Sequence, residues 1–340
     1  MSSSQPFVSI VTPVYNGARF LKECIESALQ QSYGDFEHVI LDNASTDGSR
    51  EIAEQYAAAD RRIRVVSNPA TLPMVENWNR AMEQISERST YCKVLHADDL
   101  IYPDCLSKMV DLAVRNPSIG MVGSLRLRGT FVECEGLPKE RSVFPGAEVA
   151  RLYLRQDVFG FAPTSGLIRA DLVRGTRPFY PPRYLHSDLA NYLDLLDRVD
   201  YGFVHEVLCF SRIHEDSMTT LVTSQRQTLM REWLLMLQEY GPRYFGPEEL
   251  ARLERDHLRR CYRLLVRGLV TGRGRDFLQY HLAGLRAAQR APSIATLGRA
   301  MVAEFGAAIA HPKKALRHVE AALAGGSIRS AAQSSRNGPP

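Results

Sequence analysis

The sequence lacks several features that mark whole classes of protein. None of its six cysteines stands in a CxxC pair, so we interpret them as reduced packing residues of a cytoplasmic protein, not as disulfides or zinc ligands. No stretch approaches the ~20 apolar residues that span a bilayer. The start, MSSSQPFVSIV, has no basic segment followed by a long apolar one, and we expect no secretory signal. TPVYNG follows the first predicted strand where GxGxxG would stand, which argues against a nicotinamide dehydrogenase.

What is present is the composition of an ordinary globular protein with an uneven charge. The chain has 340 residues, 45% hydrophobic and 24% charged, enough for one large domain and an appendage. Its net charge of +4 is the sum of two unlike parts. From residue 222 onward there are 19 Lys and Arg against 9 Asp and Glu, or +10, and before it 23 against 29, or −6. This division predicts two regions with different partners.

The first half alternates short apolar runs rich in β-branched residues with apolar residues at helical spacing. The predicted strands are Phe7–Thr12, Phe36–Leu41, Ile63–Val66, a short run at Val94 and Leu95, and Ile119–Val122. Such alternation implies parallel strands joined by right-handed crossovers. The expected fold class is therefore an α/β/α sandwich with a mostly parallel sheet.

The second half changes character. A helix over Ser187–Leu196 and a strand over Tyr201–Phe210 are predicted, and from Val222 the periodicity is helical, with a break at Pro312. The residues from Gly325 on are small and polar, which predicts disorder. We expect a catalytic domain at 1–221, a helical region at 222–324 and a disordered tail at 325–340.

Acidic residues follow two of the predicted strands. Asp42 ends the second, and Asp98 and Asp99 come just after Leu95. Parallel strands end at one rim of a sheet, where ligands bind, so these carboxylates should converge although they are far apart in sequence. Paired carboxylates suit a hard cation such as Mg²⁺ or Mn²⁺. The alternative is a solvated acidic turn that caps the next helix.

Six segments resemble, in order, the signatures of glycosyltransferase family 2. They are SIVTPVYNG, VILDNASTDGS, VENWNRAM, LHADDLIYPDCL, SDLANYLDLL and VLCFSRIH, and the resemblance covers about residues 5 to 220. It implies the GT-A fold and inverting, metal-dependent transfer from a nucleotide-sugar. His96, Asn43 and Ser187 depart from the family pattern, since acidic residues are common at these positions.

The resemblance also implies a donor site. Asp42 can accept the ring N–H of a uracil, and Tyr15 can pack against the ring or the sugar. Pro13 and Val14 would contribute backbone at the same rim. Two further positions match the family near the nucleotide, namely Asn79 and Asp98. For Asp42, a cap of the following loop is the alternative, and for Asn79 a solvent-facing helix position.

The remaining roles concern the cation, the diphosphate and the acceptor. Asp99 would bind Mn²⁺ or Mg²⁺ directly, and His214 resembles the closing histidine that contacts metal or diphosphate. Arg212 would contact the phosphates. Asp188 is the implied general base, with a helix N-cap as its alternative. We assign Thr164 and Ser165 to the acceptor side.

The expected partners are a nucleotide-sugar, with UDP as the expected nucleotide, and a saccharide or lipid-linked acceptor in cell-surface polysaccharide synthesis. The basic C-terminal helices predict peripheral attachment to the cytoplasmic face of an anionic membrane, with homodimerisation as an alternative. They show no aromatic-lined groove, so we expect no nucleic-acid binding. A catalytically degenerate relative that binds a nucleotide or another protein is the rival function.

Overall fold

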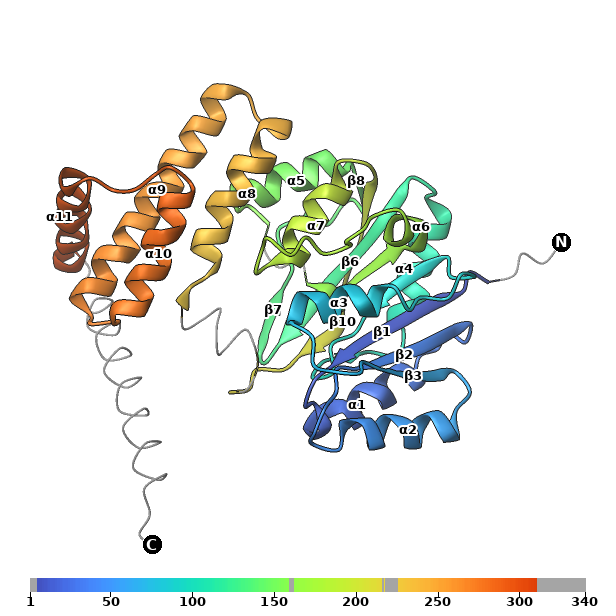
Figure 1. Cartoon of the computed structure of the whole chain (residues 1–340). Helices are drawn as coiled ribbons and strands as arrows, with labels where there is room; N and C mark the ends of the chain where they lie inside the picture. Colours follow the sequence, from blue (N-terminus) through green and yellow to red (C-terminus); the bar gives the residue numbers. More distant parts are fainter. Residues whose placement is uncertain (1–4, 159–161, 216, 218–225, 311–340) are drawn as a thin grey trace, which may run out of the picture. The chain divides into compact units, whose positions relative to one another are not determined.

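The computed structural model describes residues 5–158, 162–215, 217 and 226–310. The chain divides into two compact units, residues 1–221 and 222–340 (Figure 1). The tail expected at 325–340, and the part of the last predicted helix beyond residue 310, lie outside the described residues.

The first unit is built on one sheet with a parallel half and a mixed half. In order across the sheet, β3-β2-β1-β4 are parallel neighbours, β9 pairs antiparallel with both β4 and β6, and β10 pairs parallel with β6. Short antiparallel strands β5, β7 and β8 complete it. The strands are β1 (Val8–Val14), β2 (Phe36–Asp42), β3 (Ile63–Ser67), β4 (Tyr91–Val94), β5 (Leu100–Ile101), β6 (Ile119–Arg128), β7 (Phe131–Glu133), β8 (Val143–Phe144), β9 (Gly166–Arg169) and β10 (Asp200–Ser211).

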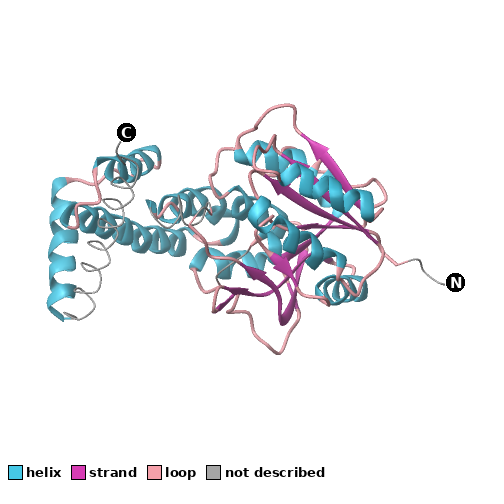
Figure 2. Cartoon of the chain, turned by 90° about the horizontal axis from the view of Figure 1, so that it is seen from below, coloured by secondary structure: helices cyan, strands magenta, loops and turns pink. Residues whose placement is uncertain are grey.

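Helices lie on both sides of this sheet (Figure 2). They are α1 (Ala18–Leu29), α2 (Ser49–Ala59), α3 (Met74–Met82), α4 (Cys105–Arg115), α5 (Gly146–Arg155), α6 (Ala170–Arg174) and α7 (Ser187–Leu196), with a 3-10 turn η1 (Pro163–Ser165). The predicted α/β sandwich is confirmed. The sequence did not predict β5, β7, β8, α5 or α6. The three strands have two or three residues and α6 has five, too few to show a period, whereas α5 has a regular apolar face that was missed.

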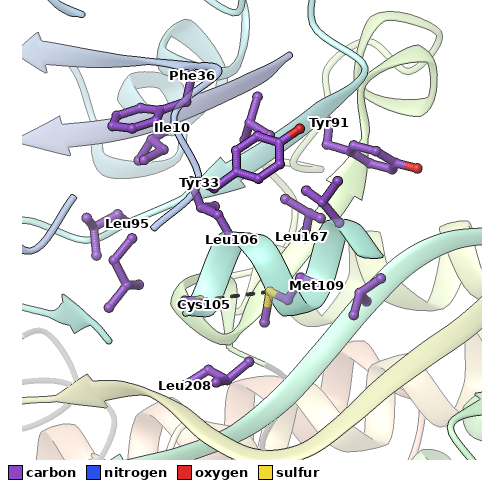
Figure 3. Packing of buried hydrophobic residues seen from close by; sticks show 14 of the residues in the cluster. Ile10, Tyr33, Phe36, Tyr91, Leu95, Cys105, Leu106, Met109, Leu167 and Leu208 are labelled. Atoms are coloured by element: carbon purple, nitrogen blue, oxygen red, sulfur yellow. Dashed lines mark hydrogen bonds between the residues drawn. The ribbon is translucent and has the colours of Figure 1, made fainter. Parts of the chain in front are cut away.

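Alternation along β1 divides the core between the two faces. Ile10 packs in a cluster with residues of α1 and α4, whereas Val11 borders a small apolar hollow beside α3. Successive strand residues point to opposite faces, which accounts for this division. Figure 3 shows α4 turning Cys105, Leu106 and Met109 toward the strand residues of the same cluster. The i, i+1, i+4 spacing of these three residues gives α4 its single buried stripe.

The second unit consists of four described helices: α8 (Leu229–Tyr244), α9 (Pro247–Val270), α10 (Arg275–Ala287) and α11 (Ile294–Ala310). Leu234, Leu258, Leu265 and Leu285 form the centre of its own core. Leu265 of α9 thus packs against the other helices of this unit. Among the described residues, no helix combines the length and the apolar character needed to cross a membrane.

Candidate functional site

The carboxyl ends of the parallel strands form the rim that the sequence predicted. Val14 at the end of β1 pairs with Asp42 at the end of β2, and Val11 pairs with Val94 at the end of β4. The segment His96–Asp99 therefore leaves the sheet close to the turn that follows β1. Polar residues distant in sequence come together here because the strands are parallel and in register.

The turn after β1 is locked to the loop after β2. Asn16 has a positive φ of 50°, receives Thr46 N–H on its side-chain oxygen and donates its own N–H to Ser45. Gly17 N–H donates to Ser49. These contacts hold Tyr15 at the rim with 55% of its surface exposed. An exposed ring on a fixed turn is suited to stacking on a planar ligand.

Asp42 is buried, and its carboxylate accepts the Ser45 N–H at 3.2 Å. In this structure it caps the loop that follows β2, which is the alternative that the sequence left open. Val14 is also buried, and its carbonyl accepts the Asn43 N–H. Pro13 is partly buried and lines the hollow beside α3.

Asn43, a departure from the family pattern, has a structural explanation. Its side-chain oxygen accepts from Asn68 and from Leu72 N–H, and its amide nitrogen donates to the Leu72 carbonyl. Asn68 also donates to Asn77. Only an amide offers both a donor and an acceptor here, so an aspartate could not make the same set of bonds.

Three possible cation ligands converge after β4. One ligand atom each from His96, Asp98 and Asp99 lies within 4.8 Å of the other two. Two carboxylates and an imidazole form a donor set that suits Mn²⁺ and tolerates Mg²⁺ through the carboxylates. His96, which replaces the acidic residue of the family pattern, therefore still offers a ligand atom.

Asp99 is held by two hydroxyl groups from distant parts of the chain. Thr164 donates to its Oδ2 at 2.6 Å and Ser211 donates to the same oxygen at 3.0 Å. Burial raises the pKa of Asp99, the neighbouring Asp98 raises it further, and His96 and both hydroxyls act in the opposite direction. Among the described residues, both side-chain hydrogen bonds to Asp99 reach Oδ2, which leaves Oδ1 for a cation.

His214 joins this cluster from the segment that follows β10. Its Nε2 lies 3.0 Å from Asp98 Oδ2, and its ring packs on Phe20 with centroids 4.8 Å apart. Within the described residues, its buried Nδ1 has no hydrogen-bond partner. An orphaned buried nitrogen on a histidine that contacts Asp98 fits a cation or phosphate site.

Arg212 has a different contact from the predicted one. Its guanidinium forms an ion pair with Glu23 of α1 and stacks over Phe20 at 4.9 Å. The buried Nε has no partner in the described part of the chain. A diphosphate would therefore compete with Glu23 for this side chain.

Asp188 lies in the first turn of α7 and is partly exposed. Burial of its carboxylate raises its pKa, while His186 and His96 favour the charged form. A raised pKa makes a carboxylate a stronger base than an ordinary aspartate.

Three residues that the sequence assigned to the nucleotide or the acceptor form hydrogen bonds within the protein. The Asn79 amide donates to the Tyr180 carbonyl at 2.9 Å and accepts the Tyr180 N–H at 2.7 Å. It thus anchors the loop before α7, and its assignment near the nucleotide stays a prediction. Thr164 and Ser165 are buried, the first bonded to Asp99 and the second to the Ala162 carbonyl. These contacts are structural, and the assignment of both residues to the acceptor side stays a prediction.

Sequence reasoning missed two contributors to the site. Trp78 of α3 stacks on His96 with ring centroids 5.7 Å apart. Ser211 directly follows the predicted strand Tyr201–Phe210 and had no distinguishing signal. For Trp78, the available signal was a large aromatic residue next to Asn79 in the segment VENWNRAM.

Comparison with known proteins agrees with this geometry. Residues 9–174 match the sequence model of the family described as Glycosyl transferase family 2. Over 111 residues the chain is 35% identical to TuaG of Bacillus subtilis (strain 168), which is named as a teichuronic acid biosynthesis glycosyltransferase. This alignment covers 33% of the chain and 43% of TuaG, so the chain matches less than half of that relative.

Solved structures share the fold over more of the chain. TarS 1–349 of S. aureus, crystallised with UDP-GlcNAc, superposes with a TM-score of 0.63 at 15% identity, covering 84% of this chain and 82% of that one. The mannosyltransferase PcManGT from Pyrobaculum calidifontis, in complex with GDP-Man and Mn²⁺, gives 0.57 at 16% identity, covering 96% and 87%. At these identities the likeness is one of fold.

Proposed function

Since residues 9–174 belong to glycosyl transferase family 2 and the first unit has the GT-A fold, we propose that this protein transfers a sugar from a nucleoside diphosphate to a hydroxyl group of a saccharide or lipid-linked acceptor. The observation that supports this most is the convergence of His96, Asp98 and Asp99 at the strand ends, with His214 beside them. It combines a cation site with the rim where a nucleotide would lie.

The donor would bind along the rim from Tyr15 to Asp98. Tyr15 would stack on the base, and Asp42, whose carboxylate also accepts the Ser45 N–H, would accept the ring N–H of a uracil. UDP is the nucleotide that this pairing favours. Pro13 and Val14 would line the base, and Asp98 would reach the ribose.

The departing diphosphate requires positive charge. A bound Mn²⁺ or Mg²⁺ would supply Lewis-acid stabilisation of that charge, and Asp99 and His214 are the residues that we assign to hold it, with His96 as a third candidate. Arg212 would contact the phosphates after release from Glu23. The chain's part is to orient these groups before the reaction.

Asp188 would take the proton from the acceptor hydroxyl while that oxygen attacks the anomeric carbon. Direct attack opposite the leaving diphosphate inverts the configuration, and no second carboxylate is assigned as a covalent nucleophile. The raised pKa of Asp188 makes it a stronger base than an exposed aspartate.

We assign the second unit to a location at an anionic membrane surface, where lipid-linked acceptors are found. At the end of α9, Leu269 and Val270 are 53% and 62% exposed, and the exposed residues Arg273 and Arg275 follow them. Apolar side chains flanked by cations favour the interface of an anionic bilayer. A second copy of the chain is the alternative partner for this surface.

The deciding experiment is a screen of UDP- and GDP-sugars for cation-dependent hydrolysis or transfer by the purified full chain. Turnover that disappears with excess chelator supports the proposal. Tight binding of UDP without any turnover, across sugars and acceptors, would instead support the degenerate relative that the departures at His96 and Ser187 suggest.

A further inference from the structure

A lysine lies inside the sheet at a position where burying a hydrophobic residue would cost less free energy. Lys93 is in β4, between β1 and β9, and is fully buried. Its strand neighbours Cys92 and Val94 are also buried. Removing an ammonium group from water is costly, so a lysine at such a position calls for a specific reason.

The contacts of Lys93 show what its charge does. Its Nζ donates to the Thr164 carbonyl at 2.7 Å and to the Gly166 carbonyl at 3.2 Å, and lies 4.0 Å from Met109 Sδ. The two carbonyls flank Ser165 in the turn that leads into β9. One cation thus fixes the main chain on both sides of this turn.

The same turn carries the hydroxyl that orients the cation-binding carboxylate. Thr164 donates to Asp99 Oδ2 at 2.6 Å, the shorter of the two bonds to that oxygen. Resting on the function proposed above, we infer that Lys93 is a positioning residue for the cation site and acts through Thr164. It holds the Thr164 hydroxyl where Asp99 can present its other oxygen to the metal.

Metal affinity distinguishes a positioning role of Lys93 from a role in packing alone. Groups that orient metal ligands typically change metal affinity about ten- to a hundred-fold when they are removed. A lysine that only fills space would affect the melting temperature and leave the affinity of the folded protein unchanged.

Titration of free Mn²⁺ by electron paramagnetic resonance, well below the melting temperature, tests the inference without turnover. Lys93→Met should weaken Mn²⁺ binding by about ten- to a hundred-fold. The control Lys108→Met removes an exposed lysine of α4 that pairs with Glu206 and should bind as the unchanged chain does. Circular dichroism confirms folding, and Lys93→Gln, with the same expected direction, replaces Lys93→Met if that variant does not fold.

A double-mutant cycle tests the route through Thr164. Thr164→Val should weaken Mn²⁺ binding, and adding Lys93→Met should weaken it little further, because both changes break one chain of contacts. Independent, multiplying losses would overturn the inference, as would unchanged affinity in Lys93→Met or its replacement. Absence of Mn²⁺ binding by the unchanged chain would instead overturn the cation site itself, and the inference with it.

Discussion

The imidazole Nε2 of His214 lies 3.0 Å from Asp98 Oδ2, although 116 residues separate the two in the chain. The contact joins the end of the mixed half of the sheet to the end of its parallel half. His214 is also packed on Phe20 of α1, so the first helix, the carboxylates and the segment after β10 form one assembly. Changes to any of the three should therefore alter ligand binding.

We predict that Asp99→Asn abolishes transfer and weakens UDP binding in the presence of Mn²⁺. Asparagine keeps an oxygen for Thr164 and Ser211 but loses the charge that a cation requires. Isothermal titration with and without Mn²⁺ measures the loss, and Asp111→Asn on the exposed side of α4 is the control. Full activity of the unchanged protein in excess chelator would refute the cation requirement.

We predict that Asp188→Asn lowers kcat by ~10²–10⁴-fold, the usual contribution of a positioned general base. UDP affinity should change little, because Asp188 is assigned to the acceptor. Asp197→Asn, at the other end of α7, is the matched control. A loss of only a few-fold would identify Asp188 as a helix cap.

The raised pKa of Asp188 also predicts a pH-dependent effect on stability. An acid whose pKa is higher in the folded than in the unfolded chain contributes stability below its unfolded pKa of ~3.9, and this is lost as pH rises through the folded value. Asp188→Asn does not ionise, so its melting temperature should exceed that of the unchanged chain at pH 8 and approach it toward pH 4. Differential scanning calorimetry across this range measures the difference, and a gap that widens as pH falls would contradict the assignment.

Tyr15→Ala should weaken UDP binding about two- to twelve-fold, as expected for loss of an aromatic stacking contact worth ~0.5–1.5 kcal/mol. Because the ring is 55% exposed, the melting temperature should stay nearly constant. Tyr102→Ala, another exposed tyrosine, controls for nonspecific effects. Equal affinity in Tyr15→Ala would place the base elsewhere on the rim.

The membrane assignment predicts that the full chain floats with anionic vesicles of phosphatidylserine and phosphatidylcholine at low salt, and less at high salt. Combined Leu269→Ser and Val270→Ser should reduce flotation. Val114→Ser, which changes an exposed valine of the first unit, should not. If the unchanged chain stays unbound on anionic vesicles at low salt, sedimentation equilibrium should then reveal a dimer.

Much of the fold could be predicted from sequence because its signals are local. The strands before Asp42 and Asp98 are short apolar runs, and the helix that begins at Ser187 has regular spacing over the whole of α7. Parallel pairing then follows from their alternation with helices. The strand ends and their parallel pairing were enough to predict that Asp42, Asp98 and Asp99 lie at one rim of the sheet.

The contacts within the site could not be predicted in the same way. Thr164 was assigned to the acceptor, yet it bonds to Asp99, because β9 inserts antiparallel between β4 and β6. No local pattern encodes that insertion. The isolated charge in YCKVL was a readable signal for Lys93, since a lysine within a buried strand demands a compensating contact.

The placement of β9 also sets an order of assembly. The parallel strands β3-β2-β1-β4 use only residues up to Val94, so this half of the sheet can pair while the rest of the chain is still being synthesised. Asp99 obtains its two hydroxyl partners only 65 and 112 residues later, from Thr164 and Ser211. Such distant contacts form late because each requires closure of a long loop. A nascent chain stalled before Ser211 would therefore carry all of the proposed nucleotide rim and only part of the proposed cation site.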